Sequence, residues 1–467
     1  MFMCKDFHFD IPTIRKYCDE VPDDVFETDD LLNDTTARWE REGEDFKKFP
    51  YSPIEEITAV QTRNTISVVE YAFEHVPFYR DLYKKVGYKS GDLRTLDDLK
   101  YLPIINKQIL SQVDLAERTS AISDPREHFL TSTSGSSGKS LQILYGRESV
   151  QRESFEYYRQ FNIMLKGRSD PKRWIYNLHM SRGWVSSLNG LYPTFTLHEA
   201  VDLDELVQHL RKLRPQVFCM LASYLKHLLP IAEEMRNAGV ELIVTNSETS
   251  SREERAFYSE KYGLPILDDY SSCEAGIIAC ECGHGRYHIN SDGVYLELVG
   301  DGDWGETVVT DFRNLVMPVI RYNQGDIAKW DDIGCNCKCG QKTPGFSEVL
   351  GRKDDSFLKP DGTEIPSASL LNAIDEIFTD TSGGLDQYRL VERDIGVLEL
   401  VFVLRNDAAS ISESHLKRLK DQLKVLYTGQ VSLTSVPVSK MPKLGGYKRR
   451  KVISDRKAER SGLHNAR

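Results

Sequence analysis

Three strand-like segments, each followed by an amphipathic helix, restrict the fold of this chain more than any other feature. In chain order, the segments and their helices are WIYNL with VDLDELVQHLRKL, QVFCML with YLKHLLPIAEEMRNAG, and ELIVTN with REERAFYSEKYG. Such a repeat predicts parallel βαβ units and therefore an α/β fold. Ligands of parallel sheets bind at the carboxyl ends of the strands. The polar segments TNSETSS and DDYSSCEAG, which follow ELIV and LPIL, are therefore candidate pocket residues.

The length of 467 residues predicts more than one domain, because a single core rarely serves more than about 300 residues. We expect a large N-terminal domain over residues 1–350, with parallel or mixed sheets, helices and a cysteine-rich insertion around 280–340. Residues 351–467 are expected to form a small α+β domain, with strands in YRLVERDIGVLELVFVLR and VSLTSVPV and a helix in ESHLKRLKDQLKVLY. Helical spacing of apolar residues predicts a helix over 57–76 that ends at Pro77, whereas residues 1 to about 50 are acidic and weakly patterned.

The charge of the chain excludes two classes of partner. A formal net charge of −11 argues against nucleic acid and anionic membrane, because both require a basic surface. No apolar run reaches the ~18 residues that span a bilayer. The first residues, MFMCKDFHFDIP, carry acids where a signal peptide carries a basic region. We therefore expect a cytoplasmic protein that binds neither nucleic acid nor membrane.

The segment TSTSGSSGKS, residues 131–140, ends like the phosphate loop of P-loop NTPases. That loop requires a glycine where this chain has Thr133, and a helix where a strand is predicted. A flexible linker is one alternative, since serine and glycine are typical of linkers. The density of hydroxyls and glycines favours a different phosphate-binding loop, in which glycines allow close backbone approach and a lysine adds charge. The residues predicted to contact phosphate are Thr131, Ser132, Ser134, Gly135, Ser136, Ser137, Gly138 and Lys139.

Five of the nine cysteines fall in two tight groups about fifty residues apart, in CECGHGRYH and CNCKCG. In a cytosol that keeps thiols reduced, such grouping indicates metal ligation before disulfides. Zinc is the expected metal, because structural zinc sites take four Cys or His ligands. Unbound loop cysteines are the alternative.

Six segments, in order, resemble motifs of the adenylate-forming (AMP-binding) superfamily of acyl-CoA synthetases. They are TSTSGSSGKS, NSET, DDYSSCEAG, RYNQGDIAKW, LGRKDD and MPKLGGYKRRKVIS. The resemblance is strongest to the phenylacetate-CoA ligase-like branch, which includes proteins of capsular polysaccharide biosynthesis, and it extends from about residue 55 to 451. It implies a large domain joined by a hinge to a mobile C-terminal domain that carries a catalytic lysine.

The resemblance assigns a role to residues of each motif. Glu274 is implied as the Mg²⁺ ligand, Lys448 as the catalytic lysine and Asp354 as the hinge. The residues implied around the adenine and ribose are Ser247, Glu248, Tyr270, Ser271, Asp326 and Arg352. The residues expected to line the pocket for the acid are Trp184, Tyr224, Ser272 and Gly276. The zinc ligands implied by the branch are Cys282, His288, Cys337 and Cys339, which leaves Cys280, His284 and Cys335 as surplus or alternates.

Two motifs depart from the family pattern. The ribose motif usually reads Arg-Thr-Gly-Asp, whereas this chain has Asn323-Gln324-Gly325-Asp326. The residue before the catalytic lysine is usually glycine, and here it is Tyr447. Lys443 and Lys451 therefore remain alternatives to Lys448.

The function implied is ATP-dependent activation of a carboxylic acid as an acyl-adenylate, followed by transfer to a thiol, with coenzyme A as the expected acceptor. ATP, Mg²⁺ and structural Zn²⁺ are the implied cofactors. An aryl acid is suggested by the family, while short aliphatic and amino acids stay open. Delivery to an amine or a carrier protein is a second hypothesis, and a non-catalytic zinc-containing interaction protein is a third. The sequence also leaves a homodimer open.

Overall fold

A large mixed sheet dominates the computed structural model, which describes residues 29–133, 140–179, 184–188, 191–198, 202–300, 304–331, 336–378, 385–404, 410–442 and 451–456. Thirteen strands belong to this sheet, in the order β12-β13-β14-β15-β11-β10-β9-β8-β7-β4-β6-β5, with β1 paired to β14. The α/β fold class is therefore confirmed.

The parallel half of the sheet contains the three predicted strand–helix units. Its strands are β4 (Ile175–His179), β6 (Leu191–His198), β7 (Val217–Leu221), β8 (Leu242–Asn246) and β9 (Ile266–Ser272). Helices cover both faces. One face carries α8 (Leu203–Leu213), α9 (Tyr224–His227), α10 (Ala232–Ala238) and α11 (Arg252–Tyr262), over an apolar core that includes Phe218, Met220 and Ile243.

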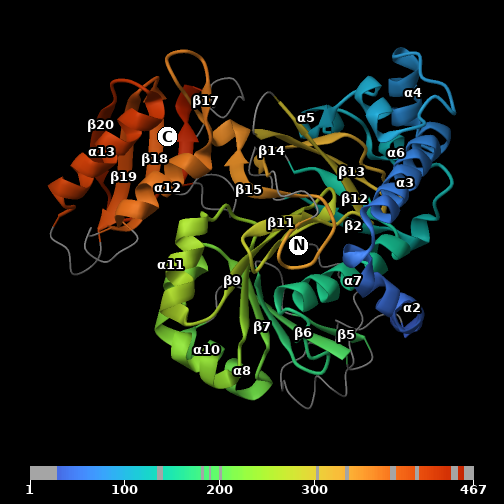
Figure 1. Cartoon of the computed structure of the whole chain (residues 1–467), viewed down its shortest axis with the longest axis horizontal. Helices are drawn as coiled ribbons and strands as arrows, with labels where there is room; N and C mark the ends of the chain where they lie inside the picture. The colour runs from blue at the N-terminus through green and yellow to red at the C-terminus, as the bar shows by residue number, and fades with distance from the viewer. Residues whose placement is uncertain are drawn as a thin grey trace.

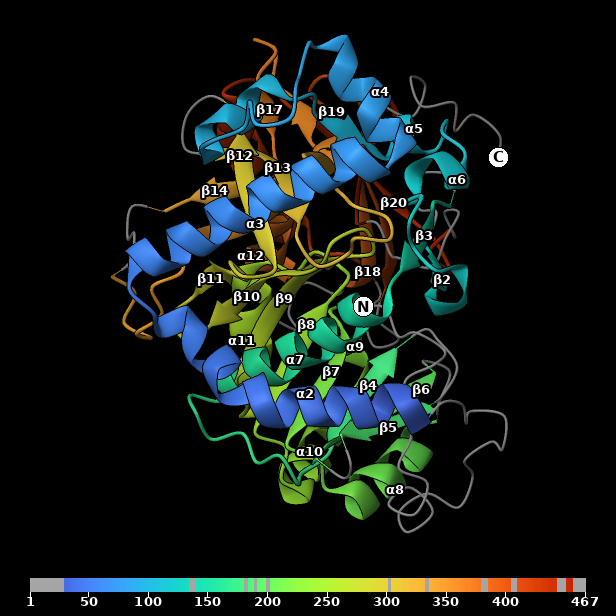
Figure 2. The same ribbon diagram turned by 90° about the vertical axis from the view of Figure 1, so that its right-hand side faces the viewer.

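The opposite face is covered by α7 (Arg147–Met164) and α2 (Asp29–Lys48), which lie across the strands in Figure 2. Trp39 of α2 packs on Phe155 of α7 with ring centroids 5.0 Å apart. No helix was predicted from the sequence in residues 1 to about 50, so α2 was missed. Its inward face holds few large apolar groups, chiefly Leu31, Trp39 and Phe46, so the helical period is faint in the sequence.

Antiparallel strands extend the sheet on one side. They are β10 (Gly276–Cys282), β11 (Arg286–Ile289), β12 (Val294–Val299), β13 (Trp304–Asp311), β14 (Tyr322–Trp330) and β15 (Gly345–Arg352). β5 (Trp184–Leu188) closes the other edge, and β1 (Ile105–Asn106) pairs with β14. The motif DDYSS lies inside β9 rather than after it, because pairing with β10 continues to Ser272.

The N-terminal helices pack beside β12 and β13. α3 (Ile54–His75) ends before Pro77, where α4 (Pro77–Lys85) begins, so the predicted helix over 57–76 and its end are confirmed. α5 (Lys107–Leu110) and α6 (Leu115–Arg118) follow. β2 (Phe129–Ser132) and β3 (Gln142–Tyr145) are antiparallel neighbours on either side of the serine-rich segment, which confirms the strand, and not a helix, predicted after it.

A separate apolar core lies between residues 357 and 452. Its helices and strands form the orange and red end of the molecule in Figure 1. Its sheet has the order β20-β19-β18-β21. The predicted helix matches α13, and the predicted strands match β18, β19 and β20. The elements here are β16 (Phe357–Leu358), β17 (Glu364–Ile365), α12 (Ser367–Phe378), β18 (Leu385–Asp394), β19 (Val397–Leu404), α13 (Glu413–Tyr427), β20 (Ser432–Pro437) and β21 (Val452–Ser454). Among the described helices, none combines the length and apolarity needed to cross a bilayer.

Candidate functional site

Residues of three nucleotide motifs meet on the antiparallel side of the large sheet. Asp326 on β14 is the register partner of Arg352 on β15, and Arg352 Nε lies 3.0 Å from Asp326 Oδ1. The hydroxyl of Tyr270 on β9 donates to Asp326 Oδ2 at 3.0 Å and also contacts Thr307 Oγ1 at 2.9 Å. The charge of Asp326 raises the pKa of Arg352, and burial raises the pKa of Tyr270. Motifs that are more than fifty residues apart in sequence are thus in direct contact.

Glu274 lies buried in the turn between β9 and β10, where its Oε1 accepts a hydrogen bond from the Tyr322 hydroxyl at 2.9 Å. Lys107, the first residue of α5, is within electrostatic reach of this carboxylate. Burial lowers the pKa of Lys107, the charge of Glu274 opposes that shift, and Arg352 adds to it. The sequence did not single out Lys107 or Tyr322, because their relation to Glu274 depends on the pairing of β1 with β14.

Ser247 and Glu248 directly follow β8. Ser247 has a φ of 64°, in the left-handed region that non-glycine residues seldom occupy. Glu248 Oε2 accepts a hydrogen bond from the backbone N–H of Ser223 at 2.9 Å, which ties the segment after β8 to the segment after β7. Both segments lie at the carboxyl ends of parallel strands, where ligands of such sheets bind.

The residues predicted to line the acid pocket are not all neighbours. Ser272 and Gly276 face each other across the β9–β10 turn, and the Ser272 hydroxyl accepts a hydrogen bond from the Ala275 N–H at 3.1 Å. Tyr224 begins α9 and packs against the apolar core under α8 and α10. The side chain of Trp184 is outside the described residues.

Other predicted residues have partial descriptions or none. Thr131 and Ser132 form the end of β2. Asp354 lies in a short 3-10 turn after β15, but its side chain is outside the description. The predicted residues that lie entirely outside are Ser134, Gly135, Ser136, Ser137, Gly138, Lys139 and Lys448.

The alternative lysine, Lys451, is among the described residues and contacts side chains of both cores. Its Nζ donates to Glu254 Oε1 on α11 at 2.8 Å and lies 5.7 Å from the ring centroid of Tyr388. Burial lowers the pKa of Lys451, but the carboxylates of Glu254 and Asp375 raise it by more. Lys226 and Asp386 form a second bridge between the cores, with 3.0 Å between Nζ and Oδ1.

Four donor side chains converge beside β10 and β11. One sulfur or nitrogen atom from each of Cys282, His288, Cys337 and Cys339 lies within 4.8 Å of all the others. The sulfurs of Cys282 and Cys337 are 3.7 Å apart, close to the ~3.8 Å edge of a tetrahedron with ~2.3 Å zinc–sulfur bonds. His288 directs Nε2 toward Cys339 at 3.2 Å and Nδ1 toward the Thr343 carbonyl at 3.3 Å. The donor set thus fits a structural zinc ion with an oriented imidazole. Cys280 and His284 are not members of this set, and Cys335 is outside the description.

A buried polar group on α7 was not predicted. Gln160 Nε2 donates to Asp269 Oδ2 at 3.2 Å, and Glu153 and Tyr157 precede Gln160 on the helix. Burial raises the pKa of Asp269 to about 6 and that of Glu153 to about 8. Asp269 belongs to the segment DDYSS of the sequence, but the sequence pattern alone does not show that its side chain is buried against α7.

Comparison with known proteins bears directly on this site. No family model matches the chain. The phenylacetate-coenzyme A ligase of Thermus thermophilus is 25% identical over 452 residues, which cover 87% of this chain and 98% of that protein. A 2-hydroxyisobutyryl-CoA ligase in its postadenylation state, with an acyl-AMP bound, matches with a TM-score of 0.70 at 20% identity, over 88% of this chain and 92% of that chain. The same ligase in its thioesterification state, with CoA present, matches with a TM-score of 0.56 at 20% identity, over 89% and 94% of the two chains.

The full-length match and the shared two-part architecture agree with the ordered motifs. The chain is thus similar, over most of its length, to a phenylacetate-CoA ligase, and its fold is that of the acyl-CoA ligase it matches.

Proposed function

We propose that this protein activates a carboxylic acid with ATP and transfers the acyl group to coenzyme A. The proposal rests mainly on the contact between Tyr270, Asp326 and Arg352, which come from separate nucleotide motifs. Glu274 and Lys107 lie close by and supply opposite charges for a nucleotide–metal complex. An aryl acid is one candidate substrate, because the named relatives include phenylacetate-CoA ligases.

The reaction proceeds in two transfers. A carboxylate oxygen of the acid attacks the α-phosphorus of ATP, the bond to the pyrophosphate oxygen breaks, and pyrophosphate leaves. The thiolate of coenzyme A then attacks the acyl carbon, and AMP leaves with the bonding electrons of its acyl–oxygen bond. Positioning and charge neutralisation account for most of the catalysis of the first transfer, since both reactants are anions. In this protein Asp326 would hold the ribose hydroxyls, Tyr270 and Ser271 would border the adenine, and Arg352 would lie beside the ribose.

Glu274 is the proposed ligand of Mg²⁺, which prefers carboxylate oxygens and would neutralise phosphate charge when bound. The proposed zinc ion is held by Cys282, His288, Cys337 and Cys339 and serves structure, because protein donors supply all four positions.

The C-terminal core, joined after Arg352 at a hinge near Asp354, is proposed to reorient between the two transfers. The lower match to the thioesterification state of the related ligase supports this view. Lys226–Asp386 and Lys451–Glu254 stabilise the described arrangement and would have to separate.

Acid-dependent exchange of labelled pyrophosphate into ATP tests the adenylation step. Wild-type protein should catalyse exchange with at least one acid of a panel of aryl, aliphatic and amino acids, and Asp326→Ala should lower the rate at least about 100-fold. Glu148→Gln, a change at an exposed position of α7, is the matched control and should retain the rate. The proposal is contradicted if none of the acids supports exchange, or if ADP is released. Addition of coenzyme A, amines or a carrier protein then identifies the acceptor.

A pair of lysine variants separates the two lysine candidates. Lys448→Ala should abolish exchange while sparing thioester formation from a supplied acyl-adenylate. Lys451→Ala removes an interdomain ion pair and should retain exchange, since Lys451 is bound to Glu254. Normal exchange in Lys448→Ala would remove that lysine from the mechanism.

Metal analysis tests the zinc assignment independently. Purified protein should carry about one equivalent of zinc, and Cys282→Ser should lose it together with thermal stability. Cys280→Ser is the matched control, because Cys280 lies on the same strand outside the donor set. Less than about a tenth of an equivalent in wild-type protein would refute a structural zinc.

A further inference from the structure

The face of α7 that meets β9 carries polar side chains. Glu153, Tyr157 and Gln160 are spaced four and three residues apart, so they lie on one side of the helix. Gln160 reaches Asp269 on β9, with 3.2 Å between Nε2 and Oδ2. Glu153, Gln160 and Asp269 are only 8%, 3% and 3% exposed, so this group lies in the interior.

Several atoms of this group have no hydrogen-bond partner among the described residues. They are Asp269 Oδ1, Gln160 Oε1, Glu153 Oε1 and the hydroxyls of Tyr157 and Ser271. A buried polar atom left unpaired costs about 1–3 kcal/mol. A carboxylate oxygen and an amide oxygen only accept hydrogen bonds. The missing partner of Asp269 and Gln160 is therefore a donor.

Other buried carboxylates that contact α7 have arginine partners. Asp292 Oδ1 lies 2.7 Å from Arg159 Nη2, and Glu156 pairs with Arg313. Among the described residues, no cation lies within ion-pair distance of Asp269 or Glu153. Because burial raises the pKa of Glu153 to about 8 and that of Asp269 only to about 6, Glu153 is mainly protonated and Asp269 mainly charged at neutral pH. The group therefore carries one negative charge, on Asp269, that is not paired with a cation of any described side chain.

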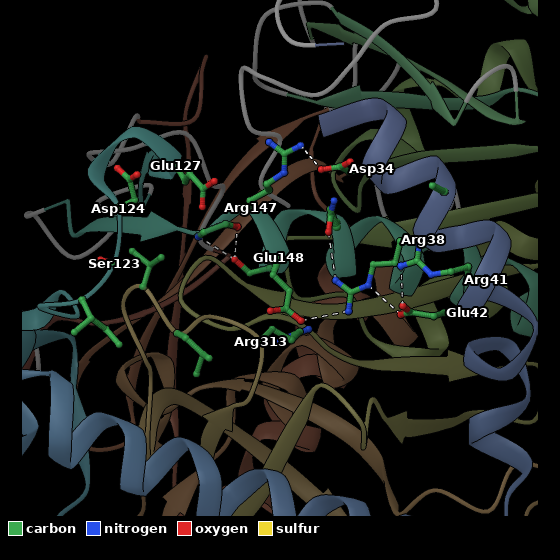
Figure 3. A pocket seen from close by; sticks show the side chains of 17 residues that line it. Asp34, Arg38, Arg41, Glu42, Ser123, Asp124, Glu127, Arg147, Glu148 and Arg313 are labelled. Carbon is green, nitrogen blue, oxygen red and sulfur yellow. Dashed lines mark hydrogen bonds and ion pairs between the residues drawn. The ribbon is translucent and has the colours of Figure 1, made fainter. Parts of the chain in front are cut away.

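At the outer end of α7, by contrast, charged side chains form ion pairs with one another. A cavity of about 820 Å³ between α2 and the start of α7 is lined by charged side chains (Figure 3). Arg38 lies 3.0 Å from Glu42 and 3.3 Å from Glu148, and Arg147 lies 2.5 Å from Asp34. These exposed charges are paired, whereas the buried charge of Asp269 has no ion-pair partner among the described side chains.

The position of Asp269 relates this group to the proposed nucleotide site. Asp269 directly precedes Tyr270, whose side chain contacts Asp326. It is paired in register with Asn246, the last residue of β8, just before Ser247 and Glu248. The unpaired acceptors therefore lie at the carboxyl ends of parallel strands, next to the predicted adenine contacts.

We propose that this group binds the substrate side chain and that the substrate is an amino-substituted carboxylic acid, whose ammonium group is received by Asp269 and Gln160. The inference rests on the proposed function, since it names the acid that would be adenylated. An ammonium offers three donors and one positive charge, which match the unpaired acceptors and the charge. An acid without the amino group leaves those acceptors unpaired, and sites of this kind strongly reject such analogues.

Pyrophosphate exchange with matched acid pairs tests the inference on wild-type protein. The pairs are phenylalanine with 3-phenylpropanoate, 4-aminobutanoate with butanoate, and alanine with propanoate. In at least one pair the amino acid should show a kcat/KM at least about 100-fold higher than its partner. Equal or better use of the amino-free acids overturns the inference while leaving adenylation intact. If none of the acids supports exchange, the proposed function is refuted, and the inference, which depends on it, is refuted as well.

Asp269→Asn identifies the residue responsible. It should lower kcat/KM for the preferred amino acid about 100-fold while changing the amino-free partner by less than about threefold. A merely structural role would lower both alike, which would overturn the assignment. Gln160→Leu is a second variant if the first does not fold, and the same selective loss is expected. Glu148→Gln, on the outer end of α7, should leave both members of each pair unchanged.

Discussion

Two buried aspartates contact neighbouring residues of α7 and differ in their partners. Asp292 is 6% exposed and accepts from Arg159 at 2.7 and 2.9 Å and from Arg152 at 3.1 Å. Asp269 is 3% exposed, accepts a hydrogen bond from the amide of Gln160 at 3.2 Å, and has no arginine within ion-pair distance among the described side chains. Burial raises the pKa of Asp292, but the charges of the two arginines lower it by more. Burial raises the pKa of Asp269 to about 6. Because their ion-pair partners differ, we assign Asp292 to stabilising the fold and Asp269 to the proposed binding of a ligand.

The largest expected effect on stability follows from breaking the ion pairs of Asp292. Asp292→Asn leaves the buried Arg159 and the half-buried Arg152 without their carboxylate, so we expect the free energy of unfolding at pH 7 to fall by about 3–5 kcal/mol. Urea unfolding followed by tryptophan fluorescence measures the change. A loss below about 1 kcal/mol would mean that the ion pair does not hold α7 to the sheet.

Neutralising Asp269 should change the free energy of unfolding in the opposite direction and by a smaller amount. The pKa of Asp269 is about 6 in the folded protein and near 3.8 in the unfolded chain, so the folded state binds the proton more tightly. Stability contributed by this group therefore falls as the pH rises from about 4 to 6, and the cost is complete above that range. Asp269→Asn should be more stable than wild type by about 1–3 kcal/mol at pH 8 and equal to it at pH 4. Thermal melts at both pH values check the sign, and destabilisation at pH 8 would contradict it.

The smallest effect is expected at the exposed end of α7. Glu148 pairs with Arg38 at 3.3 Å, but its side chain is 66% exposed. Glu148→Gln should change the unfolding free energy by less than about 0.5 kcal/mol, because solvent screens such pairs. A larger loss would show that charges at the outer cavity stabilise the contact between α2 and α7.

Much of the fold was predictable because its elements have strong local signals. The predicted strand–helix repeats, whose strands are β4, β7 and β8, alternate apolar strands with amphipathic helices, and α13 matches the predicted helix because its apolar residues recur at helical spacing. α2 was missed because few large apolar side chains mark its inward face. The packing of α2 on α7 depends on tertiary contacts such as Trp39 with Phe155.

The candidate site was predictable where short motifs carry their own pattern. The order of motifs indicated Tyr270, Asp326 and Arg352, and the resemblance selected the same four donors that meet beside β10. Lys107 and the polar face of α7 were not predictable, because their importance depends on strand pairing and on which helical face is buried. Most of α7 is buried, so polar residues at Glu153 and Gln160 do not mark a solvent face as they would in an ordinary amphipathic helix.

Trapping the first product tests the central claim most directly. Wild-type protein is incubated with Mg²⁺, ATP and an acid that supports exchange, in the absence of coenzyme A, and the bound product is analysed by mass spectrometry. We predict an acyl-adenylate with the mass of the acid plus AMP less water, and its conversion to a thioester and AMP when coenzyme A is added. Recovery of unreacted acid with ATP, or of an acyl phosphate with ADP, would contradict the claim.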